Sequence, residues 1–152
     1  MLTVERALDL KACEGQQLGA SDWVTVTQQD IDAFARLTGD DHWIHVDAAR
    51  AATEMPDGRT IAHGLFVLSL APALQRQIYR IEKRGRGFNY GYDRVRFVSP
   101  VQMGSRVRLS QTLIAATRHE KGTRLEIEAT IEIEGATRPA IVARNIILIE
   151  DQ

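Results

Sequence analysis

The chain has 152 residues and a mass of 17.0 kDa, which suits one domain with a sizeable core. Its 19 Lys and Arg residues nearly balance 20 Asp and Glu residues, and the formal net charge is -1. No basic field favours nucleic acid or an anionic membrane, and no apolar run reaches the roughly 20 residues that a membrane span requires. We therefore expect a single domain over residues 1–152, with no nucleic-acid or membrane partner.

The N-terminal residues and the cysteine count favour the cytoplasm. The first residues, MLTVERALDLKACEG, carry charges where a secretory signal peptide has an apolar run. The one cysteine, Cys13, has no partner for a disulfide within the chain. Both observations make the cytoplasm the expected compartment.

The first regular elements are predicted before residue 40. Residues 22–28, DWVTVTQ, are typical of a short strand. Thr27, with Asp30 three residues later, is the pattern that begins a helix, because both side chains can satisfy free backbone N–H groups of the first turn. Apolar residues then recur at helical spacing, and Gly39 is placed to end the helix in a left-handed turn.

The segment LTGDDHWIHVD, residues 37–47, gathers acidic and imidazole side chains between two helices. Asp47 can cap a second short helix, so the stretch from Asp40 to Val46 is expected to be a loop pinned at both ends. Asp40 and His45 are close enough for both side chains to point into one cavity. There a carboxylate and an imidazole can position a water molecule and transfer its proton. The alternative from spacing alone is that Asp40 caps a turn and His45 packs in the loop.

A metal site in the same segment is the weaker interpretation. His42 and His45 lie near three aspartates, but two histidines at this spacing without a third strong ligand downstream are a weak zinc pattern. We expect no metal.

Residues 61–74, IAHGLFVLSLAPAL, are apolar on every side and continue in helix formers to about Tyr79. A helix that is apolar all round is buried all round. Gly64 stands at its start, where free N–H groups gather and the missing Cβ lets a carbonyl oxygen approach and be polarised. The alternative for Gly64 is a packing glycine.

Ser69, on the same predicted helix, has two possible roles. Its hydroxyl either faces the pocket as a hydrogen-bonding group or donates to the backbone carbonyl one turn back. No convincing Ser-His-Asp arrangement surrounds it, so nucleophilic catalysis by this serine is disfavoured.

Four strands are predicted at about 87–98, 105–118, 123–134 and 139–150. In LEIEATIEI, apolar residues alternate with polar ones at period two, and short turns indicate antiparallel neighbours. The dry face of that sheet needs a cover, and only the helix at 61–79 is apolar enough. We therefore expect an α+β hot-dog fold, a bent antiparallel sheet wrapped around a long central helix. Its exposed edges favour a homodimer or a dimer of dimers.

Two stretches, FARLTGDDHWIHVDAARAA and TIAHGLFVLSL, resemble the MaoC-like hydratase/dehydratase family, also called the R-specific enoyl-CoA hydratase family. The likeness extends over residues 22–152. It implies reversible syn hydration of a trans-2-enoyl thioester to the (R)-3-hydroxyacyl thioester, in a hot-dog dimer or larger assembly. It implies no metal and no redox cofactor, with coenzyme A present only as part of the substrate. By position it assigns catalysis to Asp40 and His45, and binding of the thioester carbonyl to the Gly64 N–H group.

His42 and Trp43 stand where the family has Asn-Pro, a version similar to the branch of nodulation protein N relatives. The missing Asn removes a polar contact near the catalytic pair, and Trp43 either narrows the acyl pocket or anchors the loop. The run EKRGRG, residues 82–87, is a solvated loop or a contact for coenzyme A phosphates. Further candidates for the pocket are His42, His63, Ser69, Asn89 and Tyr90.

Two other functions remain open. A hot-dog acyl-CoA thioesterase would attack the same carbonyl with water, but it usually needs a carboxylate on the buried helix, and residues 61–74 contain none. A non-catalytic acyl-thioester-binding protein would not need both Asp40 and His45. We therefore expect a hydro-lyase.

Overall fold

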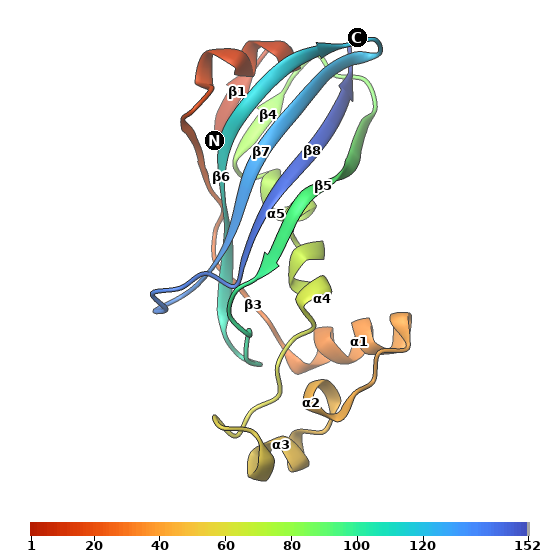
Figure 1. The fold of residues 1–152 in the computed structure, drawn as a ribbon, viewed down its shortest axis with the longest axis vertical. Helices are drawn as coiled ribbons and strands as arrows, with labels where there is room; N and C mark the ends of the chain where they lie inside the picture. The colour runs from red at the N-terminus through yellow and green to blue at the C-terminus, as the bar shows by residue number, and fades with distance from the viewer. Residues whose placement is uncertain (152) are drawn as a thin grey trace.

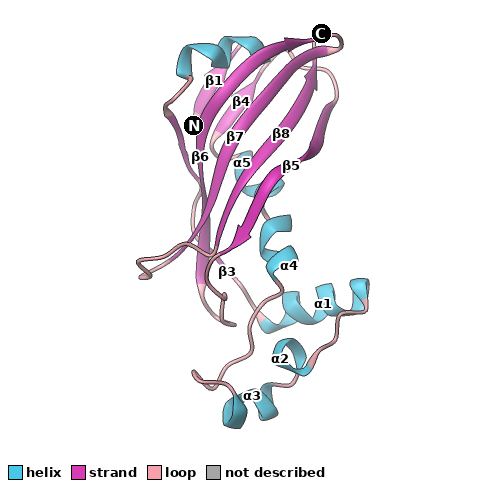
Figure 2. Cartoon of the chain, viewed as in Figure 1, coloured by secondary structure: helices cyan, strands magenta, loops and turns pink. Residues whose placement is uncertain are grey.

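The computed structural model describes residues 1–151 and is built around one long, bent antiparallel sheet (Figures 1 and 2). The sheet has the strand order β2-β6-β7-β8-β5, and β3 also pairs with β6. Three short helices lie together beyond its lower end in Figure 1. The strands are β2 Gln17–Ala20, β3 Val24–Thr25, β5 Gly87–Phe97, β6 Arg106–His119, β7 Gly122–Ile133 and β8 Ile141–Glu150.

The four long strands confirm the sequence prediction to within a few residues at each end. The clearest case is β7, where buried and half-buried residues alternate because successive side chains point to opposite faces of the sheet. Its inward-facing residues are at most 4% exposed: Leu125, Ile127, Ala129 and Ile131. The predicted strand at 22–28, by contrast, is reduced to the two residues of β3.

The single long helix predicted over 61–79 is wrong. The segment forms α4, Gly64–Ser69, and α5, Ala71–Gln75, and it ends in strand β4, Tyr79–Ile81, which pairs in parallel with β1, Leu2–Val4. Pro72 lies in the first turn of α5. Because proline has no N–H group, it cannot continue the hydrogen-bond ladder of α4, and the helix is interrupted and restarts.

The expected burial of this segment on all sides is also wrong for the single chain. Val67, Leu74 and Ile78 are at most 4% exposed and belong to the core that faces the sheet. On the other side Leu65 is 63% exposed. The bent sheet therefore covers one face of α4 and α5 and leaves the opposite face open. The sheet curved against a helical segment is the predicted α+β hot-dog architecture.

The N-terminal residues complete the core. They form a 3-10 helix, η1, over Ala7–Cys13, which the sequence pattern did not predict. Ala7 and Leu10 are at most 1% exposed, and both belong to the same core cluster as the residues of β6 and β7. None of the helices within residues 1–151 has the length and the apolar run that crossing a bilayer requires.

The helices at the lower end begin and end largely as predicted. Helix α1, Gln28–Thr38, starts with the Thr27 and Asp30 capping box and ends at Gly39, whose φ is 78°. The Asp47 side chain caps α3, Ala48–Glu54, by accepting from the Arg50 N–H group at 2.9 Å. The expected loop from Asp40 to Val46 instead contains a short helix, α2, Trp43–Val46.

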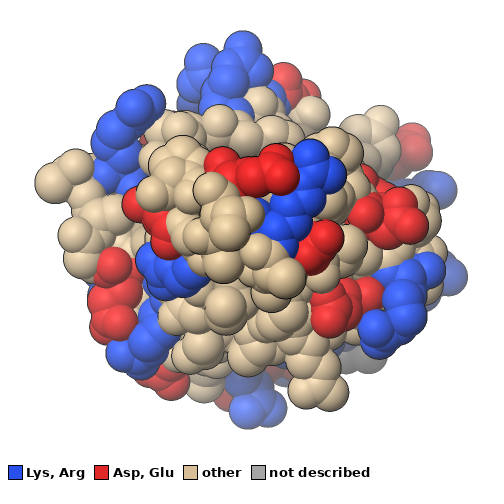
Figure 3. Space-filling model, turned by 90° about the horizontal axis from the view of Figure 1, so that it is seen from below, with Lys and Arg blue, Asp and Glu red and all other residues tan. Residues whose placement is uncertain are grey.

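The lower end of the molecule carries a mixed surface. Seen from below, Lys and Arg side chains are interspersed with Asp and Glu side chains (Figure 3). No part of this face gathers a single sign of charge, so it carries no extended basic field of the kind that attracts a nucleic acid.

Candidate active site

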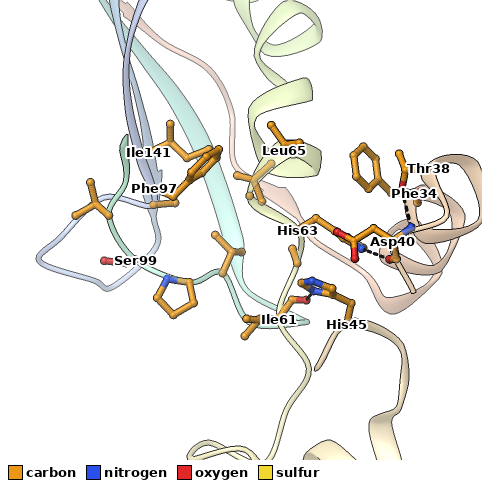
Figure 4. Close-up of a pocket in the computed structure, with 17 residues that line it drawn as sticks. Phe34, Thr38, Asp40, His45, Ile61, His63, Leu65, Phe97, Ser99 and Ile141 are labelled. Atoms are coloured by element: carbon orange, nitrogen blue, oxygen red, sulfur yellow. Dashed lines mark hydrogen bonds between the residues drawn. The ribbon is translucent and has the colours of Figure 1, made fainter. Parts of the chain in front are cut away.

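A cavity of about 450 Å³ lies between the start of α4, the end of α1 and the segment that follows β5 (Figure 4). The side formed by the helices carries polar groups: Asp40, His45 and His63. The side formed by the sheet is apolar, with Phe97, Val98 and Ile141. Such a cavity can accept an apolar chain whose polar end lies against the helices.

Backbone hydrogen bonds hold His45 in one orientation. Its Nδ1 lies 2.7 Å from the Ile61 carbonyl oxygen. Because a carbonyl only accepts, Nδ1 carries the proton and Nε2 of the neutral ring is bare. The His45 carbonyl in turn accepts from Nε2 of Gln28 at 2.7 Å. The side chain is thus fixed at both its ring and its backbone.

Burial lowers the pKa of His45 below its usual value of 6.5, because the interior disfavours the charged ring. The Ile61 carbonyl opposes this shift, and a charge on the neighbouring His63 adds to it. His45 therefore stays neutral at pH 7, with a nitrogen free to accept a hydrogen bond or a proton.

Asp40 is the first residue after the left-handed turn at Gly39 and is exposed. Its backbone carbonyl accepts from Nε2 of His63 at 2.8 Å. One carboxylate oxygen of Asp40 and one ring nitrogen each of His45 and His63 all lie within 4.8 Å of one another. The carboxylate of Asp40 and the imidazole of the nearby His45 therefore meet the more distant imidazole of His63 at one wall of the cavity.

These three side chains are poorly arranged for a metal ion. The rings of His45 and His63 are stacked, with centroids 3.8 Å apart and planes 25° apart. Each nitrogen lone pair lies in the plane of its ring, so two nearly parallel rings do not direct their lone pairs at a common point, as a tetrahedral zinc site requires. The arrangement suits hydrogen bonding to a substrate.

Gly64 lines the cavity at the first residue of α4. A Cβ built on it would lie 2.5 Å from Cδ1 of Phe97, so the aromatic ring occupies the space that a side chain would need. The two interpretations of this glycine are compatible. It allows Phe97 to pack against the backbone, and it leaves the helix start accessible from the cavity.

The other candidate residues do not line this cavity. The Arg50 guanidinium lies 4.1 Å from the ring centroid of Trp43, and the neighbouring His42 is exposed. Ser69 donates to the Phe66 carbonyl at 2.6 Å, the backbone bond that was the alternative to a pocket role.

The candidates on β5 lie on its first half, whereas the cavity lies at its last residue, Phe97. There Asn89 accepts from Nδ2 of Asn145 at 2.7 Å, and Tyr90 is 71% exposed. The basic run at 82–87 ends at the first residue of the same strand, and its Arg86 pairs with Glu150 at 2.8 Å.

Three contributors were missed in the sequence. Phe97 lies at the end of the stretch NYGYDRVRF. An aromatic residue there indicates only packing, and nothing in the pattern places it in the cavity wall. Gln28 and the Ile61 carbonyl hold His45 through contacts between distant parts of the chain. A polar residue in the first turn of a helix and a backbone carbonyl have no sequence signature for such a role.

Comparison with known proteins assigns the family. The model of the MaoC like domain matches residues 9–135. The chain belongs to the MaoC-like family. It is 45% identical over 148 residues to 3-hydroxyacyl-thioester dehydratase Z of Mycobacterium tuberculosis, with 97% of each chain covered. It is also 44% identical over 145 residues to Nodulation protein N of Rhizobium leguminosarum bv. viciae, which covers 93% of this chain and 89% of the relative.

Solved structures of other proteins share the fold. A monoamine oxidase regulatory protein from Archaeoglobus superposes with a TM-score of 0.71 at 27% identity, covering 88% of each chain. An (R)-hydratase from A. caviae involved in PHA biosynthesis superposes with a TM-score of 0.69 at 22% identity, covering 85% of this chain and 93% of the hydratase. The family and the hot-dog fold expected from the sequence are both confirmed, as is the likeness to nodulation protein N.

Proposed function

We propose that this MaoC-like protein is a hydro-lyase that reversibly hydrates a trans-2-enoyl-CoA to the (R)-3-hydroxyacyl-CoA. The observation that carries the proposal is the meeting of Asp40 and His45 at the polar wall of a cavity whose other wall is apolar. The relative at 45% identity, named as a 3-hydroxyacyl-thioester dehydratase, supports the same reaction class.

The geometry of the pair suits a bound water molecule. The Asp40 carboxylate is an acceptor, and Nε2 of His45 is a second acceptor because the proton of the ring is on Nδ1. A water molecule between them donates one hydrogen to each. Its lone pair is then directed away from both groups and towards the β-carbon of an enoyl chain that lies along the apolar wall.

In the hydration direction Asp40 takes a proton as the water oxygen bonds to the β-carbon. The electrons of the double bond move towards the thioester carbonyl, whose oxygen is held by the Gly64 N–H group. The proton then passes to the α-carbon from the same side, so that one H and one OH are added and the catalytic pair is regenerated. Addition of water changes no net oxidation state, and the proposal requires neither a redox cofactor nor a metal.

Adding the protein to crotonyl-CoA tests this function. Loss of the ultraviolet absorbance of the enoyl thioester, without release of free thiol, is the expected result. Release of thiol would indicate a thioesterase instead. If neither signal appears over short and long enoyl chains, the function as a hydro-lyase is wrong and an acyl-thioester-binding role takes its place.

We also propose that the chain works as a homodimer or a dimer of dimers. The observation behind this is the open side of the single chain, where β5 is an unpaired edge of the sheet. Large apolar side chains of α4 and β5 are 47 to 71% exposed: Leu65, Phe88, Tyr90 and Phe97. Light scattering should give a mass at least twice 17.0 kDa. A folded, strictly monomeric protein would contradict the proposal.

A further inference from the structure

His63 contacts both proposed catalytic residues, Asp40 and His45. It is 4% exposed and lies immediately before α4. Its ring packs against His45 on one side and has its centroid 4.9 Å from that of Phe34 of α1. It therefore joins α1, the segment around α2 and the start of α4, which are the three elements that form the polar wall of the cavity.

One contact of His63 fixes Asp40. The 2.8 Å distance from Nε2 to the Asp40 carbonyl requires the proton on Nε2, since the carbonyl only accepts. Asp40 follows a helix end and is exposed, and its side chain has no hydrogen bond to another residue within residues 1–151 that would fix its position. The bond from His63 to the Asp40 carbonyl, together with a longer 3.4 Å bond from the Asp40 N–H group to the Thr38 hydroxyl, holds this carboxylate near His45.

A second contact fixes the ring of His45. The two imidazoles are stacked at 3.8 Å, which leaves His45 free to slide only within its own plane. That remaining motion is restricted by the bond from Nδ1 to the Ile61 carbonyl. The stacked neighbour and the carbonyl together determine where Nε2 of His45 lies.

The second ring nitrogen of His63, Nδ1, does not contribute to the stability of the fold. Nδ1 is buried and has no hydrogen-bond partner within residues 1–151. A buried polar atom without a partner costs on the order of 1–3 kcal/mol. A residue kept only for stability would be better replaced by an aromatic ring or a fully bonded side chain, so the histidine at this position points to a role in the site.

We propose that His63 is a positioning residue for the hydration reaction, which sets the distance between Asp40 and His45 by bonding the backbone of one and stacking on the ring of the other. This inference rests on the proposed function. It assigns His63 no proton transfer and no contact with the acyl chain.

Two substitutions separate the two contacts. His63→Gln retains an N–H donor at the position of Nε2 and loses the stacked ring. His63→Phe retains the ring and loses the donor. Each should lower kcat for crotonyl-CoA on the order of tenfold with little change in KM, because misplaced reacting groups lose rate rather than affinity. His119→Gln, at the far end of β6, is the matched control and should leave kcat unchanged.

The acid limb of the pH profile distinguishes positioning from a purely structural role. The titratable groups that act on His45 are His63, Asp40 and His42. A charge on His63 disfavours a charge on His45, so removing the imidazole raises the pKa of His45. Activity that requires neutral His45 should then begin to fall at a higher pH in both variants than in the wild type.

NMR titration of the His45 ring supplies a readout that does not depend on activity. The chain has 4 histidines, which single substitutions assign. The expected result is a higher His45 pKa in both variants together with lower kcat. Folded variants with wild-type kcat and unchanged titration would overturn the proposal, as would an equal loss at every pH with unchanged titration. A third outcome is that the wild type hydrates no enoyl thioester, while the His45 pKa is still higher in the two variants. In that case the proposed function is wrong, but the interaction between the His45 and His63 rings is supported.

Discussion

The long strands and the segment from Asp40 to Gly64 are held in place by different kinds of contact. Strands β6, β7 and β8 pair along continuous antiparallel ladders, and their inward side chains form the largest part of the core. The segment that carries the site has no such ladder. A few backbone bonds join it to the stretch after β5, from Ala62 to Val101 and from Met103 to Thr60. Its reacting groups are held by separate side-chain bonds from Gln28 to the His45 carbonyl and, within the segment, from His45 to the Ile61 carbonyl and from His63 to the Asp40 carbonyl.

This difference separates stability from activity along the chain. In the sheet, each strand is held by many equivalent hydrogen bonds, so losing one side chain leaves the backbone in place and lowers the free energy of unfolding. In the site segment the side chain of His45 and the backbone of Asp40 each depend on one or two hydrogen bonds. Losing it should move a reacting group while most of the core remains intact, so activity should fall more than stability.

The largest effect on stability is expected in β7. Ile127 is 0% exposed, and Ile127→Ala should lower the free energy of unfolding by about 2–5 kcal/mol because it leaves a cavity in the core. The kcat of the folded fraction should stay at the wild-type level. Urea unfolding and crotonyl-CoA hydration measure the two quantities. Glu128→Ala, on the opposite face of the same strand, is the control, and a similar loss of stability there would contradict the comparison.

The largest effect on activity is expected at the pair itself. Asp40→Asn and His45→Ala should each lower kcat on the order of 10² or more, as removal of positioned acid-base groups does, while the fold stays intact. The double variant should be little worse than either single one, because the two groups act as a unit. Asp41→Asn is the control, since Asp41 is exposed and does not line the cavity. Near-wild-type turnover in either folded variant would remove that residue from the mechanism.

Local patterns predicted the elements that depend on nearby residues. The alternation in β7, the Thr27 and Asp30 capping box and the turn at Gly39 involve residues a few positions apart, and the structure confirms all three. The fold class followed because a sheet with one apolar face needs an apolar helix to cover it. The motif around Asp40 and His45 indicated the family, because its residue types and spacing are specific.

Distant contacts account for most of what the sequence did not reveal. Strand β4 forms because Tyr79 and its neighbours pair with the N-terminus, which overrides their preference for continuing the helix. The break before α5 was hidden because Pro72 is also compatible with the first turn of a helix. The side-chain bonds that hold the site segment join residues up to 45 positions apart, as between Gln102 and Asp57, and no local pattern reports them.

A smaller effect on activity is expected at Gln28. Its Nε2 donates to the His45 carbonyl at 2.7 Å, and its Oε1 accepts from the Thr60 hydroxyl at 2.6 Å. Gln28→Leu leaves both partners without a bond, which should lower the free energy of unfolding by about 1–3 kcal/mol and shift the backbone of His45. We expect kcat to fall on the order of tenfold. Gln29→Leu is the matched control at an exposed position, and equal losses in the two variants would show that the bond to His45 has no special effect.

The smallest effect is expected at Trp43, and it bears on which residues shape the acyl pocket. Trp43 is half-buried, does not line the cavity, and packs against the Arg50 guanidinium, a contact worth about 0.5–1 kcal/mol. This placement favours an anchor for the site segment, so Trp43→Ala should lower kcat/KM by a similar small factor for every enoyl chain length. Phe97 lines the cavity, and Phe97→Ala should instead shift the preference towards longer chains, because each added methylene that is buried contributes about 0.8 kcal/mol. Measuring kcat/KM over a ladder of enoyl-CoA lengths compares the two. A shifted length profile in Trp43→Ala would place the indole beside the acyl chain, and an unchanged profile in Phe97→Ala would remove the aromatic ring from the pocket wall.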